Sequence, residues 1–183
     1  MGAPATYRGV INHYKKCPQE IQDYFSAFPK LAEEHDWEVS LSYQFGLVER
    51  AHNMALYCGV VKLHQVDAGL ARQAIEAQHI TREYFRELFK TIFGKHVRKP
   101  IAEKLNSASS IRDKVLHGKT ANPSEMRHAV VDVLNYATEF NDFVHSIGGF
   151  RPFGPLSGFK GRAKPLPKST SRWVLKGVGF NGV

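Results

Sequence analysis

The stretch NPSEMRHAVVDVLNYATEFNDFVHSI, residues 122–147, carries the strongest helix signal in the chain. Asn122 suits the N-cap, Pro123 the first helical position, and Glu125 stands three residues after the cap, as in a capping box. Apolar residues then recur every three or four positions: Met126, Val130, Val133, Ala137, Phe140, Val144 and Ile147. This spacing predicts a long amphipathic helix that buries one face.

Three segments upstream show the same apolar spacing and are expected to form helices: 41–61, 70–94 and 100–118. Gly94 and Gly118 suit the ends of the second and third, and Pro100 suits a first helical turn. Strand-like alternation is not seen among these segments, and the connections are short. We therefore predict an all-α fold, an antiparallel four-helix bundle with an additional short N-terminal helix over 19–34.

Length and composition fit one globular domain. The chain has 183 residues, of which 43% are hydrophobic, enough to bury a core. It has neither a run of about eighteen apolar residues nor a hydrophobic segment at its start, which argues against a membrane-spanning or secreted protein. We expect a cytoplasmic protein that does not bind membranes.

Cysteine and histidine do not form a metal-binding pattern. Cys17 and Cys58 are too few and too far apart for a disulfide scaffold or a zinc site, so both are expected to be free thiols. His79 and Glu83 have the spacing of metal ligands on a helix, but no second pair accompanies them, and we interpret them as solvated. We expect neither a metal nor a cofactor.

The excess of positive charge is concentrated toward the C-terminus. The formal net charge is +8, and residues 148–183 contain seven Lys and Arg but no Asp or Glu. The same segment is rich in Gly and Pro, which interrupt regular structure. We predict a helical bundle domain over 1–147 and an irregular basic extension over 148–183, with a short strand in SRWVLKGVGF, residues 171–180.

The extension has two interpretations. In the first, its basic residues neutralise the phosphates of single-stranded nucleic acid, such as RNA, and its aromatic rings stack on the bases. The residues that would do so are Arg151, Lys160, Arg162, Lys164, Lys168, Arg172 and Trp173. In the second, the rings hold the extension against the helical domain and the lysines keep it solvated.

The third predicted helix ends in SSIRDKVLHGK, residues 109–119, where four residues separate Arg112 from His117. Spacing alone carries little weight, because Arg8 with His13 and Arg72 with His79 fit the same loose rule of four to six intervening residues. On an ideal helix, however, Arg112 lies within about 40° of the centre of the apolar stripe.

An arginine in that position points toward buried surface. Because a guanidinium is costly to bury unpaired, Arg112 must find a carboxylate, a helix end, a subunit boundary or a bound anion. Asp113 and His117 are four residues apart and share a helical face, so the carboxylate could orient the imidazole. Together these three residues form the candidate catalytic site.

The sequence Arg-Asp-Lys-Val-Leu-His-Gly, late in the third helix of a predicted bundle, resembles the signature of the HEPN superfamily. That signature is an arginine, usually a polar residue next, and a histidine after four to six positions. The resemblance covers about residues 35 to 147. It implies a homodimeric bundle in which the motifs of two subunits meet across a cleft, often with metal-independent endoribonuclease activity in toxin–antitoxin, phage-defence or CRISPR systems.

The resemblance implies a role for each motif residue. His117 would move a proton to or from the ribose oxygens, Arg112 would stabilise charge on the phosphate, and Asp113 would set the tautomer of His117. Glu49 is either a polar supporter of this site or a solvated helix-face residue. The expected partners are RNA, a second copy of the chain and an antitoxin protein. The alternatives are a non-catalytic RNA- or nucleotide-binding module and a helical protein-interaction subunit.

Overall fold

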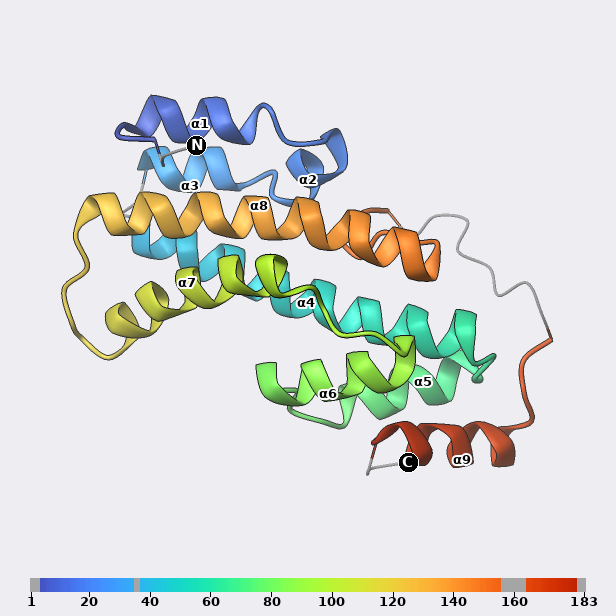
Figure 1. The fold of residues 1–183 in the computed structure, drawn as a ribbon. Coiled ribbons are helices and arrows are strands. Elements are labelled where there is room, and N and C mark those ends of the chain that lie inside the picture. Colours follow the sequence, from blue (N-terminus) through green and yellow to red (C-terminus); the bar gives the residue numbers. More distant parts are fainter. Residues whose placement is uncertain (1–3, 35–36, 156–163, 181–183) are drawn as a thin grey trace. The chain divides into compact units, whose positions relative to one another are not determined.

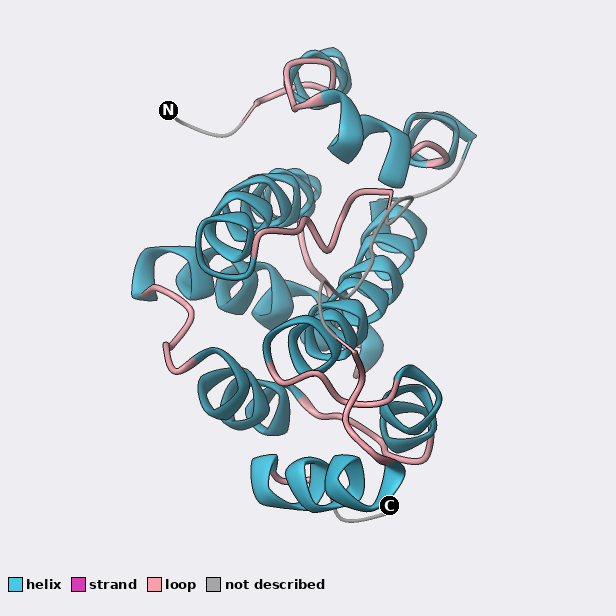
Figure 2. Cartoon of the chain, turned by 90° about the vertical axis from the view of Figure 1, so that its right-hand side faces the viewer, coloured by secondary structure: helices cyan, strands magenta, loops and turns pink. Residues whose placement is uncertain are grey.

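The computed structural model describes residues 4–34, 37–155 and 164–180. Within these ranges all regular structure is helical, which confirms the predicted all-α class, and Figure 2 shows helices joined by loops. In chain order the helices are α1 (Tyr7–Tyr14), α2 (Gln19–Tyr24), α3 (Phe28–Glu34), α4 (Trp37–Leu63), α5 (Ala68–Glu76), α6 (Arg82–Phe93), α7 (Lys99–Leu116), α8 (Pro123–Gly148) and α9 (Lys168–Val178) (Figure 1).

The helices are grouped in two compact units. Unit 1 comprises Met1–Glu49 and Arg98–Asn141, and unit 2 comprises Arg50–Val97 and Asp142–Val183. The long helices α4 and α8 each contribute their first part to unit 1 and their last part to unit 2. The proposed composition boundary between residues 147 and 148 stays a prediction.

Helix α8 begins where its capping residues predict. The backbone N–H of Glu125 donates to Asn122 Oδ1 at 2.9 Å, and that of Asn122 donates to Glu125 Oε2 at 3.0 Å, which completes the capping box. The hydrogen bond from Asn122, with a second from Lys114, holds the pKa of the Glu125 carboxyl below its ordinary value. Of the predicted apolar stripe only Ile147 is partly exposed.

Three short helices precede α4 in unit 1. The single helix predicted over 19–34 is wrong in detail, because the helical geometry is lost at Phe25 and α2 and α3 are separate. Helix α1, capped by Thr6, was not predicted, and Figure 1 shows it beside α3. Polar contacts join these helices to the rest of the unit, including His13 Nε2 to Asn135 Oδ1 at 2.9 Å.

The continuous helix predicted over 70–94 is also wrong, because unit 2 contains two helices there. Helix α5 ends at a cap on Ala77, and α6 begins where the Thr81 side chain accepts from the Tyr84 N–H at 3.2 Å. Apolar spacing continues across the break, but a local side-chain cap starts a new helix. The predicted stop at Gly94 is confirmed by its left-handed backbone, with φ of 65°.

The short strand predicted over 171–180 is wrong, since Lys168–Val178 forms α9. Ser171 and Leu175, four residues apart, are its buried side chains, and Gly179 ends it with φ of 118°. Helix α9 packs against α5 and α6. The C-terminal extension is therefore not irregular throughout the part that is described.

Candidate functional site

The end of α7 holds the motif histidine in a defined backbone geometry. His117 is the C-cap, and Gly118 follows with a left-handed φ of 69°. The Gly118 N–H donates to the Val115 carbonyl at 2.9 Å, and the Lys119 N–H donates to the Lys114 carbonyl at 2.9 Å. This is a Schellman motif, which fixes the helix end while the His117 side chain stays exposed.

Arg112 finds its partners within unit 1. Its side chain is only 18% exposed, and its guanidinium carbon lies 4.6 Å from the centre of the Phe45 ring on α4. Its Nη1 lies 3.7 Å from Glu49 Oε1, one turn further along α4. Phe45 and Glu49 share a helical face, so α4 offers a ring and a carboxylate to the same guanidinium.

The Asp113 carboxylate completes the contacts of Arg112. Its Oδ1 accepts from Arg112 Nε at 3.2 Å and Nη2 at 3.0 Å, and its Oδ2 accepts from Ser109 Oγ at 3.3 Å. Asp113 thus contacts Arg112 and Ser109, and His117, one turn further along, is exposed. The structure brings Arg112 and Asp113 together and leaves the role of Asp113 as a tautomer-setting group a prediction.

The charges around Arg112 determine which ligands this site can bind. One guanidinium faces two carboxylates, so a phosphate must displace a carboxylate before it reaches Arg112 Nη1. Glu49 is the weaker partner, because its side chain is 65% exposed and its distance is longer. Exposed ion pairs contribute about 0 to 1 kcal/mol, which a charged ligand readily offsets. Glu49 is therefore both a contact of the site and a competitor for its arginine.

The predicted RNA-binding residues all belong to unit 2, in contrast to the motif in unit 1. Arg151 pairs with Asp142 at 3.1 Å, while Lys164, Lys168 and Arg172 are exposed. Trp173 is 83% exposed. Lys160 and Arg162 lie outside the described residues.

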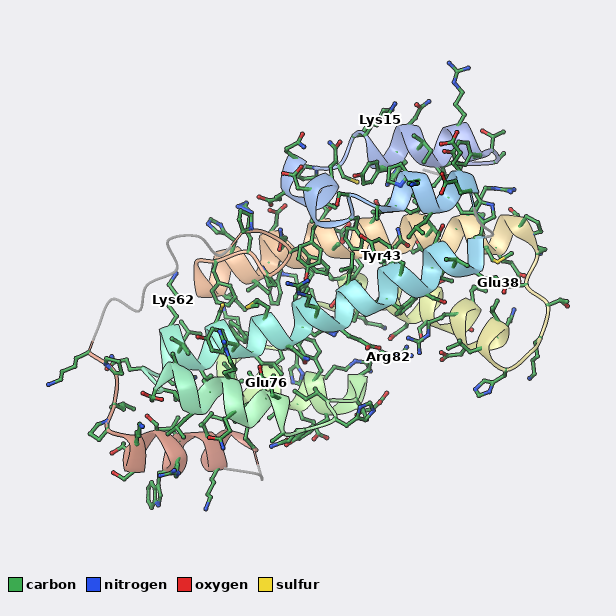
Figure 3. The ribbon with its side chains drawn as sticks, turned by 180° about the vertical axis from the view of Figure 1, so that it is seen from behind. Lys15, Glu38, Tyr43, Lys62, Glu76 and Arg82 are labelled. Carbon is green, nitrogen blue, oxygen red and sulfur yellow. The ribbon has the colours of Figure 1, made fainter. Side chains whose placement is uncertain are left out.

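The aromatic rings of the C-terminal extension differ in burial, and stacking of a base on Trp173 stays a prediction. Phe150, Phe153 and Phe180 are buried, so these rings hold the extension against unit 2. Lys62, labelled in Figure 3, donates to the Gly149 carbonyl at 2.7 Å and secures the start of the extension. Trp173 packs against little and remains available to a partner.

Other predicted properties of the chain can be compared with the structure. The described part of the chain holds no group of three or more residues able to ligate a metal, and His79 lies in the loop before α6 rather than on one helix with Glu83. Cys17 and Cys58 are free, as predicted, and burial raises the pKa of the Cys58 thiol to about 12. Among the described helices none is long and apolar enough to cross a membrane.

Sequence reasoning missed two contacts of the site. Phe45 lies within the helix predicted over 41–61 and Ser109 within the quoted motif, but the sequence assigns neither of them a role in the site. The spacing of Phe45 and Glu49 on α4 was the available signal, but pairing it with α7 requires the tertiary fold.

A comparison of the chain with protein-family models, curated proteins and solved structures found no match.

Proposed function

We propose that this chain is a metal-independent endoribonuclease of HEPN type, built as an antiparallel helical bundle that acts as a homodimer. The observation that carries the proposal is a guanidinium held at 18% exposure on the Phe45 ring, five residues before an exposed histidine at a fixed helix end. A planar donor of this kind suits the oxygens of a phosphodiester, and an exposed imidazole suits proton transfer.

The reaction needs no external nucleophile, because RNA carries one. The ribose 2′-oxygen would attack the adjacent phosphorus, the P–O5′ bond would break, and the products would be a 2′,3′-cyclic phosphate and a 5′-hydroxyl. His117 would take the 2′-OH proton or supply one to the departing 5′-oxygen, and Arg112 would stabilise the phosphorane oxygens. In a dimer the second copy would supply the other member of the acid–base pair.

The resemblance also supports a setting for this activity. The proposed enzyme would act in the cytoplasm in a toxin–antitoxin or phage-defence system, and an antitoxin protein would be its inhibitory partner. The exposed His117 at the end of α7 marks the surface that such a partner would have to cover.

Substitution of the two motif residues tests the proposal. His117→Ala and Arg112→Lys should each abolish cleavage of a mixed-sequence RNA, since lysine keeps the charge of Arg112 but loses its planar fork. Arg8→Ala and His79→Ala, which change an exposed arginine and an exposed histidine elsewhere, should leave cleavage intact. Helix content measured by circular dichroism controls for folding. Cleavage that persists in both motif variants would exclude the assignment.

One observation favours a second function, a non-catalytic RNA-binding module. Arg112 already has two carboxylate partners, so a purely structural role would account for its burial. This alternative predicts that the protein binds RNA without producing any cyclic phosphate. The RNA should then stay intact with the His117→Ala variant and with the unaltered protein alike.

A further inference from the structure

The net positive charge of the protein belongs to unit 2 and is not confined to the C-terminal extension. Unit 2 contains fourteen Lys and Arg against five Asp and Glu, a net charge of +9, whereas unit 1 has eleven against twelve, a net charge of −1. Residues 50–97 alone contribute seven basic against four acidic side chains. A polyanion would therefore be attracted to unit 2.

Helix α9 exposes an aromatic ring on the surface of this basic unit. Its inward side chains are Ser171 and Leu175, and Trp173, two residues from each, lies about 160° around the helix from both. Amphipathic packing would place a polar residue there. Trp173 is instead 83% exposed, the most exposed large hydrophobic side chain among the residues described.

The positions one turn before and after Trp173 leave its ring accessible. They hold Ser169 and Gly177, both small, and a Cβ added at Gly177 would meet nothing within 4 Å. A glycine inside a helix costs about 1 kcal/mol relative to alanine. Packing does not require Gly177, and its lack of a side chain leaves this position of the outer face bare.

Two cations of α9 lie to one side of the ring. Arg172 precedes Trp173 and Lys176 follows it by three residues, and because the two cations are four residues apart they lie on the same side of the helix, about 60° to 100° around from the ring. Both are exposed, and no acidic residue occurs in the sequence from residue 148 onward. Phosphates that run along this side of a stacked base would meet both cations without a competing carboxylate from the same helix.

The helix is held rigidly enough to present this surface in one orientation. Ser171 Oγ accepts from the Asp67 N–H at 3.0 Å and donates to the Leu166 carbonyl at 3.2 Å. At the other end, Tyr84 donates its hydroxyl proton to the Gly179 carbonyl, and Phe180 is fully buried. A preorganised platform loses less entropy on binding.

We propose that the outer face of α9 binds single-stranded nucleic acid, with a base stacked on Trp173 and neighbouring phosphates on Arg172 and Lys176. A stacked base fits a single exposed ring among cations, because bases in a duplex are not free to stack on protein. A membrane surface fits less well, since membrane-bound helices bury a broad apolar face and α9 offers one large apolar side chain outward. This surface belongs to unit 2, whereas the motif on α7 belongs to unit 1, and it does not require a 2′-hydroxyl.

Fluorescence of Trp173 tests the proposal in the full-length protein. In a Trp37→Phe background Trp173 is the sole tryptophan, so its emission reports on the α9 surface. The probe is oligo-deoxythymidine of about 12 nucleotides, a length suited to one binding surface. Because this probe lacks the 2′-hydroxyl, it cannot be cleaved by the proposed ribonuclease, and its binding is measured independently of His117.

The probe should quench Trp173, and Trp173→Ala should weaken its binding, measured by anisotropy, about 5- to 150-fold, the range expected for one lost stacking contact. Trp173→Phe should restore part of this loss. Arg172→Gln and Lys176→Gln should each reduce the slope of log K against log salt by about 0.7. Tyr7→Ala, which removes an exposed ring from unit 1, is the matched control and should change nothing.

Three results would overturn the proposal. The first is unchanged binding of the probe by Trp173→Ala. The second is binding to duplex DNA of the same length as tightly as to the single strand. The third is a change of Trp173 emission with phosphatidylserine vesicles but not with the probe, which would assign α9 to a membrane surface instead. None of these results bears on cleavage by Arg112 and His117.

Discussion

His52, on α4 in unit 2, should make the stability of the protein depend on pH. Its side chain is 5% exposed, and its ring stacks on Phe85 with 3.9 Å between centroids and 7° between planes. Burial, and after it the nearby charges of Arg82 (labelled in Figure 3) and Arg86, lower the pKa of His52 from 6.5 to about 3. The folded protein therefore holds a neutral imidazole at neutral pH.

The sign of the effect follows from the lowered pKa. When the pH falls below 6.5, the unfolded chain binds a proton at His52 before the folded chain does, so protonation favours unfolding. The loss begins near the ordinary pKa and grows until the folded-state pKa is reached. Because each pH unit in this window corresponds to about 1.4 kcal/mol, the free energy of unfolding should fall by about 2 kcal/mol between pH 7 and pH 5 through this group alone.

Urea unfolding at these two pH values measures the effect. His52→Leu removes the titrating group and keeps an apolar side chain of similar size, so its free energy of unfolding should fall by about 2 kcal/mol less than that of the unaltered protein. His79→Gln, at an exposed position, should behave like the unaltered protein. The quantity compared is the change in the free energy of unfolding between the two pH values. A loss of stability that is equal at both pH values therefore does not affect the result. If His52→Leu kept the full pH dependence, the assignment of this penalty to His52 would be refuted.

Three further predictions concern stability and binding. Gly59→Ala should destabilise the protein by about 1 to 3 kcal/mol in urea unfolding, because the new Cβ would lie 2.7 Å and 2.9 Å from side chains of α6, whereas Gly46→Ala on the same helix meets nothing and should stabilise it by about 0.5 to 1 kcal/mol. Equal effects would contradict the packing at Gly59. Glu49→Gln should tighten RNA binding up to about fivefold in a filter-binding assay, since it frees one side of Arg112, and weaker binding would contradict the competition. Asn122→Ala should lower the free energy of unfolding by about 1 kcal/mol through loss of the α8 cap, and an unchanged melting temperature would show that the cap is dispensable.

The fold could be predicted where local chemistry decides it. The start of α8 depends on a reciprocal pair of hydrogen bonds between Asn122 and Glu125, which are three residues apart. The end of α7 depends on the left-handed Gly118, which a Cβ would disfavour. Both signals need only a few neighbouring residues, so both are readable without the tertiary structure.

The fold could not be predicted where distant packing decides it. The short apolar pattern of residues 171–180 fits a strand as well as a helix, so it cannot decide between them. In the helix, Ser171 and Leu175 share one buried face that packs within unit 2. Ser171 also accepts a hydrogen bond from Asp67, which is over a hundred residues away in the sequence. The break between α5 and α6 was missed because the apolar spacing continues through it.

The contacts of the candidate site could be predicted only in part, because some of them depend on how separate helices pack. That Arg112 needs a partner follows from its place on the apolar face of one helix, and the structure supplies Glu49, Asp113 and the Phe45 ring. Which residues of α4 meet α7 depends on how the two helices pack, and spacing within either helix does not give it. The exposure of Trp173 could not be predicted either. Ser171 and Leu175 form the buried face of α9, and only once this face is known does it follow that the Trp173 ring points outward.

The attack of the 2′-oxygen is the central claim, and one substrate tests it directly. An RNA cut by the protein in the presence of EDTA would be resynthesised with a single 2′-deoxynucleotide on the 5′ side of the mapped cleavage site, and its products would be analysed by mass spectrometry. We expect the cut at that bond to disappear, while cuts at unmodified bonds continue and end in 2′,3′-cyclic phosphates. Cleavage at the deoxy-substituted bond would contradict attack by the 2′-oxygen and with it the proposed roles of Arg112 and His117.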